Sequence, residues 1–446
     1  MREFFAIIAI FSSLAAWAAT PEAPKSVADG RAPSSTVVTP CSSFAESGVR
    51  GEVETKYIRR IEEWSRSEGV LSSHFAVPFA WVNRQVVLHI GAATGGYSIE
   101  LNGKIIGNNR TGILPADFVI TKQAKEGRND VRIIPYADES EGVLSPAAEE
   151  FMVRGVRVQS PAPVRVRDLV VATHMSPEGG ALAEFGVVMK SEMLNRKQMR
   201  VYYELLARDS VRLHYGFKDI SLDMRREDTV RFAVRVPDSC LWRLRDPQML
   251  RLDIKTQNNG RYLEYHTFRL GVRTVEVDER GLIAINGKPA GLIVVAEAAP
   301  DITAEEIAAL RKEGYNTIHP RLGALSPELY RTCDSIGMFV IAPATISTER
   351  WGDSRRVGGN PSNDPAWRDA YVDRAVSAYH ALKLHPSVIA FTYAVNSSNG
   401  ICLYETYLKL KSFGDSRPML YDAVGGEWNS DRLRRFHSPE EAGIKF

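Results

Sequence analysis

The stretch LIVVAEAAPDITAEEIAALRKEGYNTIHP, residues 292–320, decides the fold class of the C-terminal part of the chain. It opens with the apolar, mostly β-branched run LIVV, which is typical of a buried strand. Thr303 and Glu306 have the spacing of a helix capping box, and Gly314 stands where a helix ends at a C′ glycine. A second apolar run starts at Thr317. The stretch therefore predicts a strand, a helix and a parallel strand.

The same alternation continues toward the C-terminus. Further strands are predicted at 338–342, 388–393 and 419–421, and further helices from Ser326, from Asp364 and at about 401–413. A complete (β/α)8 barrel takes eight strands and about 250 residues. Only about 170 residues follow Glu276. The sequence therefore predicts a partial TIM barrel over residues 276–428 and a polar tail over 429–446.

The region before the barrel reads as short strands separated by turns. Tyr97–Leu101 alternates apolar and polar residues, and Asn102-Gly103 is a tight hairpin turn, since both residue types tolerate a positive φ. This pattern predicts two β-sandwiches, a first domain at residues 51–163 and a second at 164–275. The second has the length of an immunoglobulin-like domain.

The N-terminus has the features of an export signal. Arg2 precedes an apolar run from Phe4 to Trp17, and small residues follow near Ala18. We predict a cleaved signal peptide at residues 1–18, an exported protein that is periplasmic or secreted, and no membrane insertion. Residues 19–50 are rich in Pro, Ser, Ala and Thr, which predicts a disordered linker.

The composition excludes several classes of function. The chain has 44% hydrophobic and 25% charged residues, as an ordinary globular protein does, and 56 basic against 54 acidic residues give no nucleic-acid footprint. The four cysteines are far apart, which favours buried thiols over disulfides or a metal site; Cys41, in the predicted linker, is expected to be the most exposed. With no metal cluster, phosphate-binding loop or Ser/His/Asp triad in the sequence, we expect no cofactor and no metal.

Several motifs, in order, resemble glycoside hydrolase family 2 over roughly residues 75 to 425. They are residues 97–104 with Gly107, residues 114–118, Leu241-Trp242 with Asp246-Pro247, residues 268–273, residues 286–289, Gly314-Tyr315-Asn316, residues 333–337, His385-Pro386-Ser387 and residues 415–418. The resemblance implies a jelly-roll sandwich, an immunoglobulin-like sandwich and a TIM barrel. It also implies a retaining β-glycosidase of the β-galactosidase or β-glucuronidase kind, with a carbohydrate as partner.

Retaining hydrolysis requires two carboxyl groups about 5–5.5 Å apart, one as acid/base and one as nucleophile. In the family, the acid/base is a Glu preceded by Asn at the end of the fourth barrel strand. Here Asn396 or Ser397 occupies that position, depending on a one-residue gap. Neither an amide nor a hydroxyl group can donate a proton to a glycosidic oxygen near neutral pH. We therefore predict a pseudoenzyme that acts in carbohydrate binding or is a decayed fragment; the alternative is an active β-glycosidase with a relocated site.

Six residues are candidates for such a site. Glu297, after the first barrel strand, and Glu427, after the fifth, are the fallback carboxylates; the favoured alternatives are a surface residue for Glu297 and a frayed tail for Glu427. The candidates for substrate binding are Asn396, His319, Trp351 and Trp428. The alternatives are a polar strand end for Asn396, a structural histidine for His319, a packed loop tryptophan for Trp351 and a frayed tail for Trp428.

A half-barrel exposes apolar strand edges and helix faces. Three arrangements remain open from the sequence. The chain could be a fragment of a longer gene product, a second copy could complete the barrel as a homodimer, or the βα region could form an open sheet that packs against the sandwiches.

Overall fold

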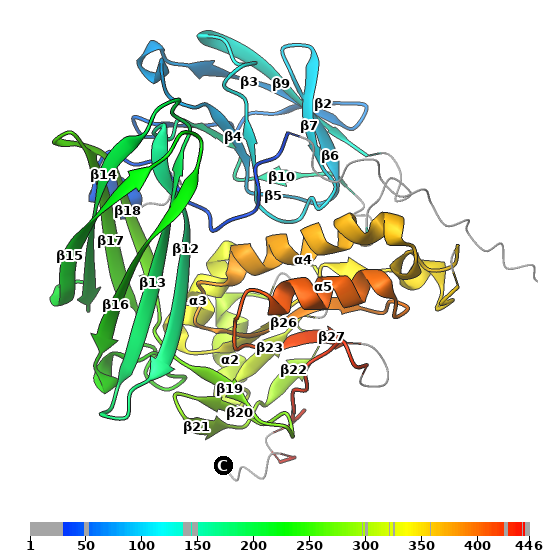
Figure 1. The fold of residues 1–446 in the computed structure, drawn as a ribbon. Coiled ribbons are helices and arrows are strands. Elements are labelled where there is room, and N and C mark those ends of the chain that lie inside the picture. The colour runs from blue at the N-terminus through cyan, green and yellow to red at the C-terminus, as the bar shows by residue number, and fades with distance from the viewer. Residues whose placement is uncertain are drawn as a thin grey trace, which may run out of the picture.

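Three units form the protein, two all-β units and one sheet covered by helices (Figure 1). The computed structural model describes residues 30–48, 53–136, 144, 150–296, 298, 302–320, 322–323, 326–356, 358–422, 427–438 and 440–441. The predicted signal peptide, residues 1–18, and the candidate carboxylate Glu297 lie outside the described residues.

The first unit is a sandwich of two antiparallel sheets that share one apolar core. The five-stranded sheet has the order β2-β3-β9-β6-β7, and the four-stranded sheet has the order β1-β11-β4-β8. A two-stranded pair, β5 and β10, lies beside them. The predicted hairpin turn is confirmed, with φ of 50° at Asn102 and 79° at Gly103. The strands are β1 (Ile58–Arg60), β2 (Ser65–Ser67), β3 (Val70–Val77), β4 (Val87–Ile90), β5 (Ala92–Ala93), β6 (Tyr97–Leu101), β7 (Lys104–Asn109), β8 (Ala116–Val119), β9 (Gly127–Pro135), β10 (Val153–Arg154) and β11 (Arg157–Gln159).

The second unit is a sandwich of longer strands. A three-stranded sheet, β12-β13-β16, packs on a four-stranded sheet, β15-β14-β17-β18. Buried side chains alternate with more exposed ones along β13 and most of β16, and Phe232 stacks on Tyr203 across the core with ring centroids 3.7 Å apart. The strands are β12 (Val164–Met175), β13 (Ala181–Ser191), β14 (Lys197–Ala207), β15 (Val211–Leu222), β16 (Glu227–Val236), β17 (Leu250–Asn258) and β18 (Arg261–Leu270).

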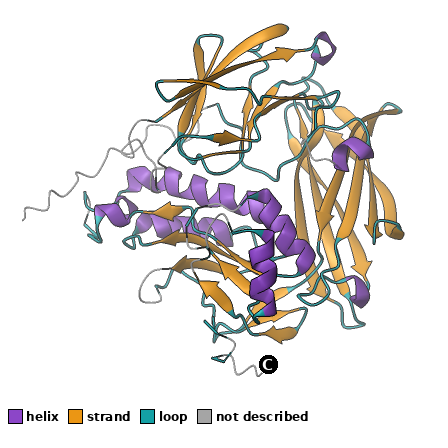
Figure 2. Ribbon diagram, turned by 180° about the vertical axis from the view of Figure 1, so that it is seen from behind, coloured by secondary structure: helices purple, strands orange, loops and turns teal. Residues whose placement is uncertain are grey.

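The third unit is an open parallel sheet with helices on one face, as the βα pattern predicts (Figures 1 and 2). The strands β22, β23, β24, β26 and β27 lie in that order, and short β25 pairs with the end of β26. One apolar cluster joins all four helices to the same face. The elements are β22 (Val294–Ala296), α2 (Ala304–Lys312), β23 (Thr317–His319), α3 (Pro327–Ile336), β24 (Phe339–Ala342), β25 (Ile346–Ser347), α4 (Arg368–Leu382), β26 (Val388–Val395), α5 (Ile401–Lys411) and β27 (Met419–Asp422).

The helix boundaries agree with the signals in the sequence. Thr303 and Glu306 form the expected capping box at the start of α2. Ser326 caps α3, which ends at Gly337 in the left-handed conformation. Helix α4 starts later than predicted, because a 3-10 turn at Pro365–Trp367 comes first.

A small hairpin sheet covers part of the other face of the parallel sheet. It consists of β19 (Val275–Val277), β20 (Ile283–Ile285) and β21 (Lys288–Ala290). Ile283 and Ile285 pack with Trp242 of the second sandwich and with Ile341 of β24 in one apolar cluster. The hairpin sheet therefore shields from water the part of this face that contains Ile341.

Residues 427–438, which we call the closing segment, are not the frayed tail that their polarity suggests. The amide of Asp431 donates to the carbonyl of Met419 (3.0 Å) on the β27 edge. Phe436 pairs in parallel with the β22 edge, since its amide donates to Leu292 (2.8 Å) and its carbonyl accepts from Val294 (2.7 Å). Both outer edges of the open sheet thus have backbone partners, which is a known way to protect exposed strand edges.

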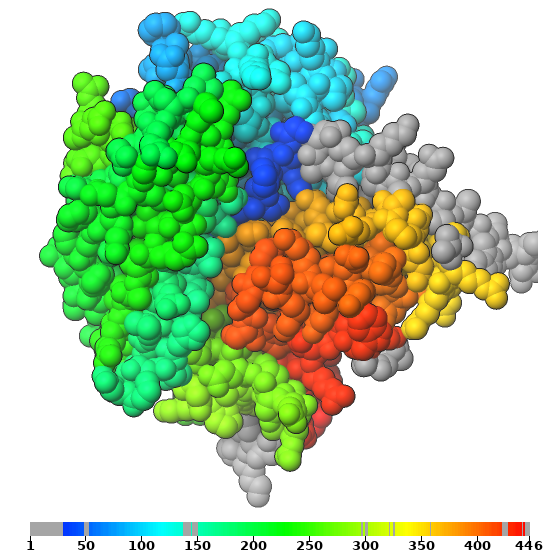
Figure 3. Space-filling view, viewed as in Figure 1, coloured from blue at the N-terminus to red at the C-terminus, as the bar shows by residue number. Residues whose placement is uncertain are grey.

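Residues 30–48, which we call the strap, correct the prediction of a disordered linker. The strap lies between the two sandwiches and α4, where Figure 3 shows it in dark blue. Arg31 forms an ion pair with Asp373 of α4, and the amide of Ala32 donates to Asp117 of β8. The strap ends in a short helix, α1 (Phe44–Gly48), against β18. Its Pro, Ser and Thr residues suit an extended segment that is ordered by hydrogen bonds to its neighbours instead of by a core of its own.

The cysteines are free thiols, as expected, but their exposure differs from the prediction. Cys41 is fully buried because the strap packs against the second sandwich, and burial raises the pKa of its thiol to about 12. Cys333 and Cys402 are buried as well, whereas Cys240 is half-buried.

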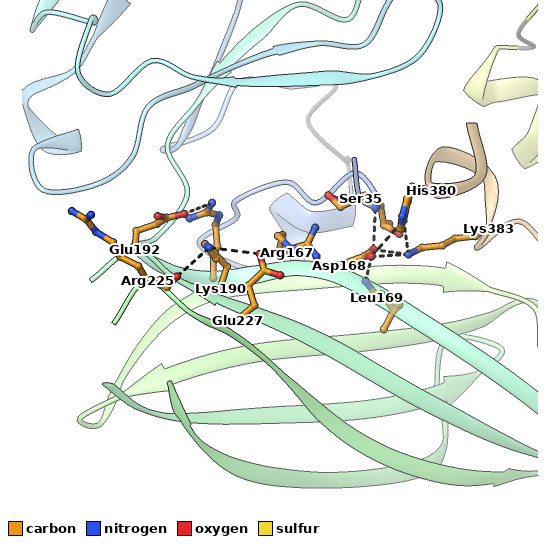
Figure 4. A network of polar contacts seen from close by, with 12 residues as sticks. Ser35, Arg167, Asp168, Leu169, Lys190, Glu192, Arg225, Glu227, His380 and Lys383 are labelled. Atoms are coloured by element: carbon orange, nitrogen blue, oxygen red, sulfur yellow. Dashed lines mark hydrogen bonds and ion pairs between the residues drawn. The ribbon is translucent and has the colours of Figure 1, made fainter. Parts of the chain in front are cut away.

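A buried ion pair joins the second sandwich to α4 (Figure 4). Lys383, at the C-terminal end of α4, donates to both carboxylate oxygens of Asp168 on β12, at 2.8 and 2.7 Å. The amides of Thr36 (3.0 Å) and Leu169 (2.9 Å) donate to the same carboxylate. The side chains of Asp168 and Lys383 are only 4% and 5% exposed, so each charge depends on the other for compensation.

In the described part of the chain, no helix is long and apolar enough to cross a membrane.

We predict that Lys383→Met destabilises the protein by about 3 kcal/mol, because it leaves the buried Asp168 carboxylate without its cation. The measurement is the midpoint of urea unfolding followed by circular dichroism. The matched control is Arg235→Met, in the exposed Arg235–Glu178 pair, for which the expected loss is below about 1 kcal/mol. Equal losses for the two variants would show that the buried pair has no special role.

Candidate functional site

The C-terminal ends of the parallel strands are the edge where a βα fold presents functional side chains. Strand β26 is buried along its whole length and ends at Val395. The next residue, Asn396, has a φ of 41°, in the left-handed region that Asn tolerates better than most residues. This turn places the Asn396 side chain in solvent, where its Nδ2 donates to Oε2 of Glu349 (3.0 Å).

Ser397 connects three strand ends. Its hydroxyl accepts from the amide of Thr348 (3.1 Å) after β25 and donates to the carbonyl of Val395 (2.9 Å). Its own carbonyl accepts from the hydroxyl of Tyr421 on β27. The Ser397 side chain is therefore engaged in holding the loop.

Glu349 is a candidate that the sequence reasoning missed. It begins the 3-10 turn Glu349–Trp351 directly after β25, and its side chain is exposed. The signal that could have identified it is an acidic residue in the segment between the third strand, which ends at Ala342, and helix α4. The structure brings it next to Asn396, the residue at the expected acid/base position.

Glu427 lies in a second polar cluster of the same loops. One carboxylate oxygen accepts from Arg355 (2.8 Å), and the other accepts from Nδ2 of Asn399 (3.0 Å). Asn399 also forms a reciprocal amide pair with Asn429, at 3.2 and 3.1 Å. Both carboxylate oxygens of Glu427 thus accept a hydrogen bond from an N–H donor.

The two candidate tryptophans differ in exposure. Trp428 is 66% exposed and packs on Tyr404, with ring centroids 4.6 Å apart. Trp351 is only 8% exposed and packs near Trp367, so it does not offer a free ring face. Of the two predicted platforms, Trp428 has the exposure that stacking on a sugar ring requires.

His319, at the end of β23, is buried on the inner face of the sheet. Its Nε2 lies 3.1 Å from the hydroxyl of Thr392, and its Nδ1 lies 3.2 Å from Nη1 of Arg435 in the closing segment. A guanidinium can only donate, so Nδ1 accepts and the proton resides on Nε2. His319 is thus a neutral structural residue, and it is not grouped with Asn396 by any described contact.

The comparisons with known proteins agree with this architecture. Residues 300–438 match the family model "Glycosyl hydrolases family 2, TIM barrel domain". The β-galactosidase of Yersinia enterocolitica is 23% identical over 384 residues, which cover 80% of this chain and 36% of that protein. The chain thus spans about a third of the length of the curated relatives it matches.

Solved structures show the same fold. The β-glucuronidase of Bacteroides uniformis superposes with a TM-score of 0.65 at 17% identity, covering 79% of this chain and 46% of that chain. A glycosyl hydrolase family 2 member from Bacteroides cellulosilyticus DSM 14838 gives a TM-score of 0.65 at 14% identity, covering 81% of this chain and 50% of that one.

Residues 300–438 are thus similar to the TIM barrel domain of glycoside hydrolase family 2.

In this family 2 homologue, the strand-end side chains that the structure describes can accept, donate and stack. Asn396 and Glu349 form one exposed polar pair, Glu427 and Arg355 form another, and Trp428 supplies an exposed ring. No group of three or more metal-ligating side chains occurs among the described residues. These side chains can form hydrogen bonds and a ring contact with a ligand at the strand ends.

We predict that Asn399→Leu destabilises the family 2 homologue by about 1–3 kcal/mol, since it leaves the fully buried amide of Asn429 without its partner. Urea unfolding measures the effect. Asn396→Gly is the control, because it removes an exposed amide at a backbone position that glycine adopts readily, and it should shift stability by less than about 0.5 kcal/mol. A larger loss for the control than for Asn399→Leu would contradict this assignment.

Proposed function

We propose that this chain is an exported family 2 homologue that binds a β-glycoside or glycan at the C-terminal strand ends without cleaving it. The proposal rests on which residue stands at the expected acid/base position, at the end of β26, namely Asn396 or Ser397. Asn396 cannot supply a proton, and the Ser397 hydroxyl already makes two hydrogen bonds within the loop.

The neighbouring carboxylates can take part in binding. Glu427 accepts from a guanidinium and an amide, and Glu349 accepts from the Asn396 amide. Carboxylate oxygens can also accept hydrogen bonds from sugar hydroxyls.

A second candidate is an active retaining β-glycosidase. It is favoured by one observation, namely that Glu349 and Glu427 are joined to the same β26–α5 loop through Asn396 and Asn399. Two carboxylates at one edge are the minimum that the retaining mechanism requires. The relatives named above are called β-galactosidase and β-glucuronidase, so the sugar would be a galactoside or a glucuronide.

We expect no hydrolysis of aryl β-galactoside, β-glucuronide, β-mannoside or β-glucoside by the purified protein, because Asn396 or Ser397 stands at the expected acid/base position. We also expect one of these sugars to change the tryptophan fluorescence, since Trp428 is exposed at the proposed site. Trp428→Ala should remove that change, and the buried Trp351 serves as the control through Trp351→Phe, which should retain it. Turnover that is lost in Glu349→Gln or Glu427→Gln would replace the proposal with the second candidate.

Export rests on the N-terminal sequence, an Arg2 followed by a short apolar run and small residues near Ala18. We expect the protein from a bacterial host to be recovered in the periplasmic or secreted fraction with a new N-terminus after about Ala18. Mass spectrometry of the intact chain checks this. A cytoplasmic protein that retains Met1 or Arg2 would contradict export, and Leu14→Arg, which interrupts the apolar run, is the control that should block it.

A further inference from the structure

The outer face of the sheet β15-β14-β17-β18, in the second sandwich, carries a continuous line of aromatic rings, which we call the ring chain. Its members are Phe217 on β15, Tyr202 on β14, Tyr262 and Tyr265 on β18, and Phe44 on α1. Successive ring centroids lie 5.8, 6.0, 5.9 and 5.0 Å apart. Figure 1 shows β14, β15 and β17 at the left edge of the molecule, on the side away from β26 and α5. The ring chain is thus separate from the strand-end site.

The register of the sheet places these rings on one face. Tyr202 is directly opposite Phe217 on one neighbouring strand and Lys255 on the other, and Lys255 is opposite Tyr265. Side chains at directly opposite positions point to the same face of a sheet. A register shift in the pairing of β17 with β18 brings Tyr262 beside them.

The ring chain is open to solvent. Phe217 and Tyr262 are 49% and 45% exposed, and Tyr202, Tyr265 and Phe44 are half-buried. Contiguous exposed apolar surface on a soluble protein is typical of a binding site. Because the rings follow one another across the sheet, they offer a long and narrow apolar surface to a ligand.

One cation lies in the middle of the ring chain. Nζ of Lys255 is 5.2 Å from the ring centroid of Tyr202 and 4.6 Å from that of Tyr262. The structure gives Lys255 no hydrogen bond or ion pair with a described residue. The carboxylates on the same face already have guanidinium partners, in the pairs Asp219–Arg200, Glu204–Arg212 and Asp253–Arg251. Lys255 therefore adds an uncompensated positive charge at this position.

The arrangement fits a glycan better than other polymers. A sugar ring has an apolar C–H face and a polar rim, and polar groups border the ring chain. Gln257 accepts from the Tyr202 hydroxyl (3.2 Å), and Glu204 lies two residues from Tyr202 on the same face. Single-stranded nucleic acid also stacks on rings, but it requires a run of free cations along its backbone. A single free ammonium instead suits a ligand with one carboxylate at this place.

We propose that the outer face of the second sandwich binds a linear acidic glycan. Its sugar rings lie along the ring chain, and one of its carboxylates accepts from the Lys255 ammonium. This site does not rest on the proposed glycan site at the strand ends.

The test is isothermal titration calorimetry of the full chain with a hexameric β-1,4-oligomannuronate, and with its methyl ester as the neutral probe of the same length. We expect the acid to bind roughly fivefold or more tightly than the ester, because only the acid pairs with Lys255. Lys255→Met should remove that preference, since it keeps an apolar stem without the charge. The matched control is Lys218→Met, which should retain the preference. Lys218 follows Phe217 on β15, so its side chain alternates away from that ring.

A second set of variants tests the rings themselves. Tyr262→Ala should weaken the binding of acid and ester alike by about fivefold, because it interrupts the ring chain. Phe79→Ala removes a ring that is 70% exposed on the first sandwich, and it should change neither affinity. Trp428→Ala, at the strand-end site, should change neither affinity as well. Circular dichroism of each variant verifies that it is folded.

Equal affinities for acid and ester, no binding of either, or loss of the preference in Lys218→Met would each overturn the proposal. Loss of binding in Trp428→Ala would do the same, since it would place the probe at the strand ends. Poly-glutamate is the final probe. If it binds as tightly as the oligomannuronate, the face recognises an acidic polypeptide and the glycan proposal is wrong.

Discussion

The carboxylate of Asp168 and the ammonium of Lys383 form a buried ion pair where β12 of the second sandwich meets the end of α4. Burial alone would raise the pKa of Asp168, but Lys383 and the Thr36 amide outweigh it and hold that pKa below its ordinary value. Burial and the neighbouring ammonium lower the pKa of His380 to about 4, so His380 is neutral and accepts from Lys383 (3.1 Å). The pair fixes the end of α4, and β26 begins only a few residues later at Val388. The ion pair thus helps to position the start of β26, the strand that ends next to Asn396.

The other half of α4 is held by the first sandwich. Arg374, which is 2% exposed, donates to the carbonyls of Thr345 (3.0 Å), Arg110 (2.9 Å) and Thr111 (3.0 Å). Such a buried guanidinium is tolerated because its donors are satisfied by fixed backbone carbonyls. One helix is therefore tied to both sandwiches and to the loop after β24.

Local signals in the sequence predicted most elements of the fold, because capping boxes, Asn-Gly turns and apolar runs act over a few residues. The capping box at Thr303 and the turn at Asn102 are examples. The strap was missed because residues 30–48 have no core of their own, and their order comes from partners such as Asp168 and Asp373, more than 130 residues away. The candidate site was predicted only in part, because contacts between residues far apart in the sequence leave no local signal. Asn396 follows from its place after a strand, whereas its contact with Glu349 depends on how two loops fold together.

The closing segment covers both edges of the open sheet and also contributes a side chain to its inner face. Backbone bonds from Asp431 and Phe436 satisfy the β27 and β22 edges, and these contacts bring Arg435 to His319 on the inner face. Nδ1 of His319 accepts a hydrogen bond from Nη1 of Arg435 there, so these two side chains fill part of the described inner face. Recognition of a ligand at the strand ends must then use the outward-facing groups. Those groups, Asn396 with Glu349 and the ring of Trp428, offer hydrogen-bonding atoms and an exposed apolar face.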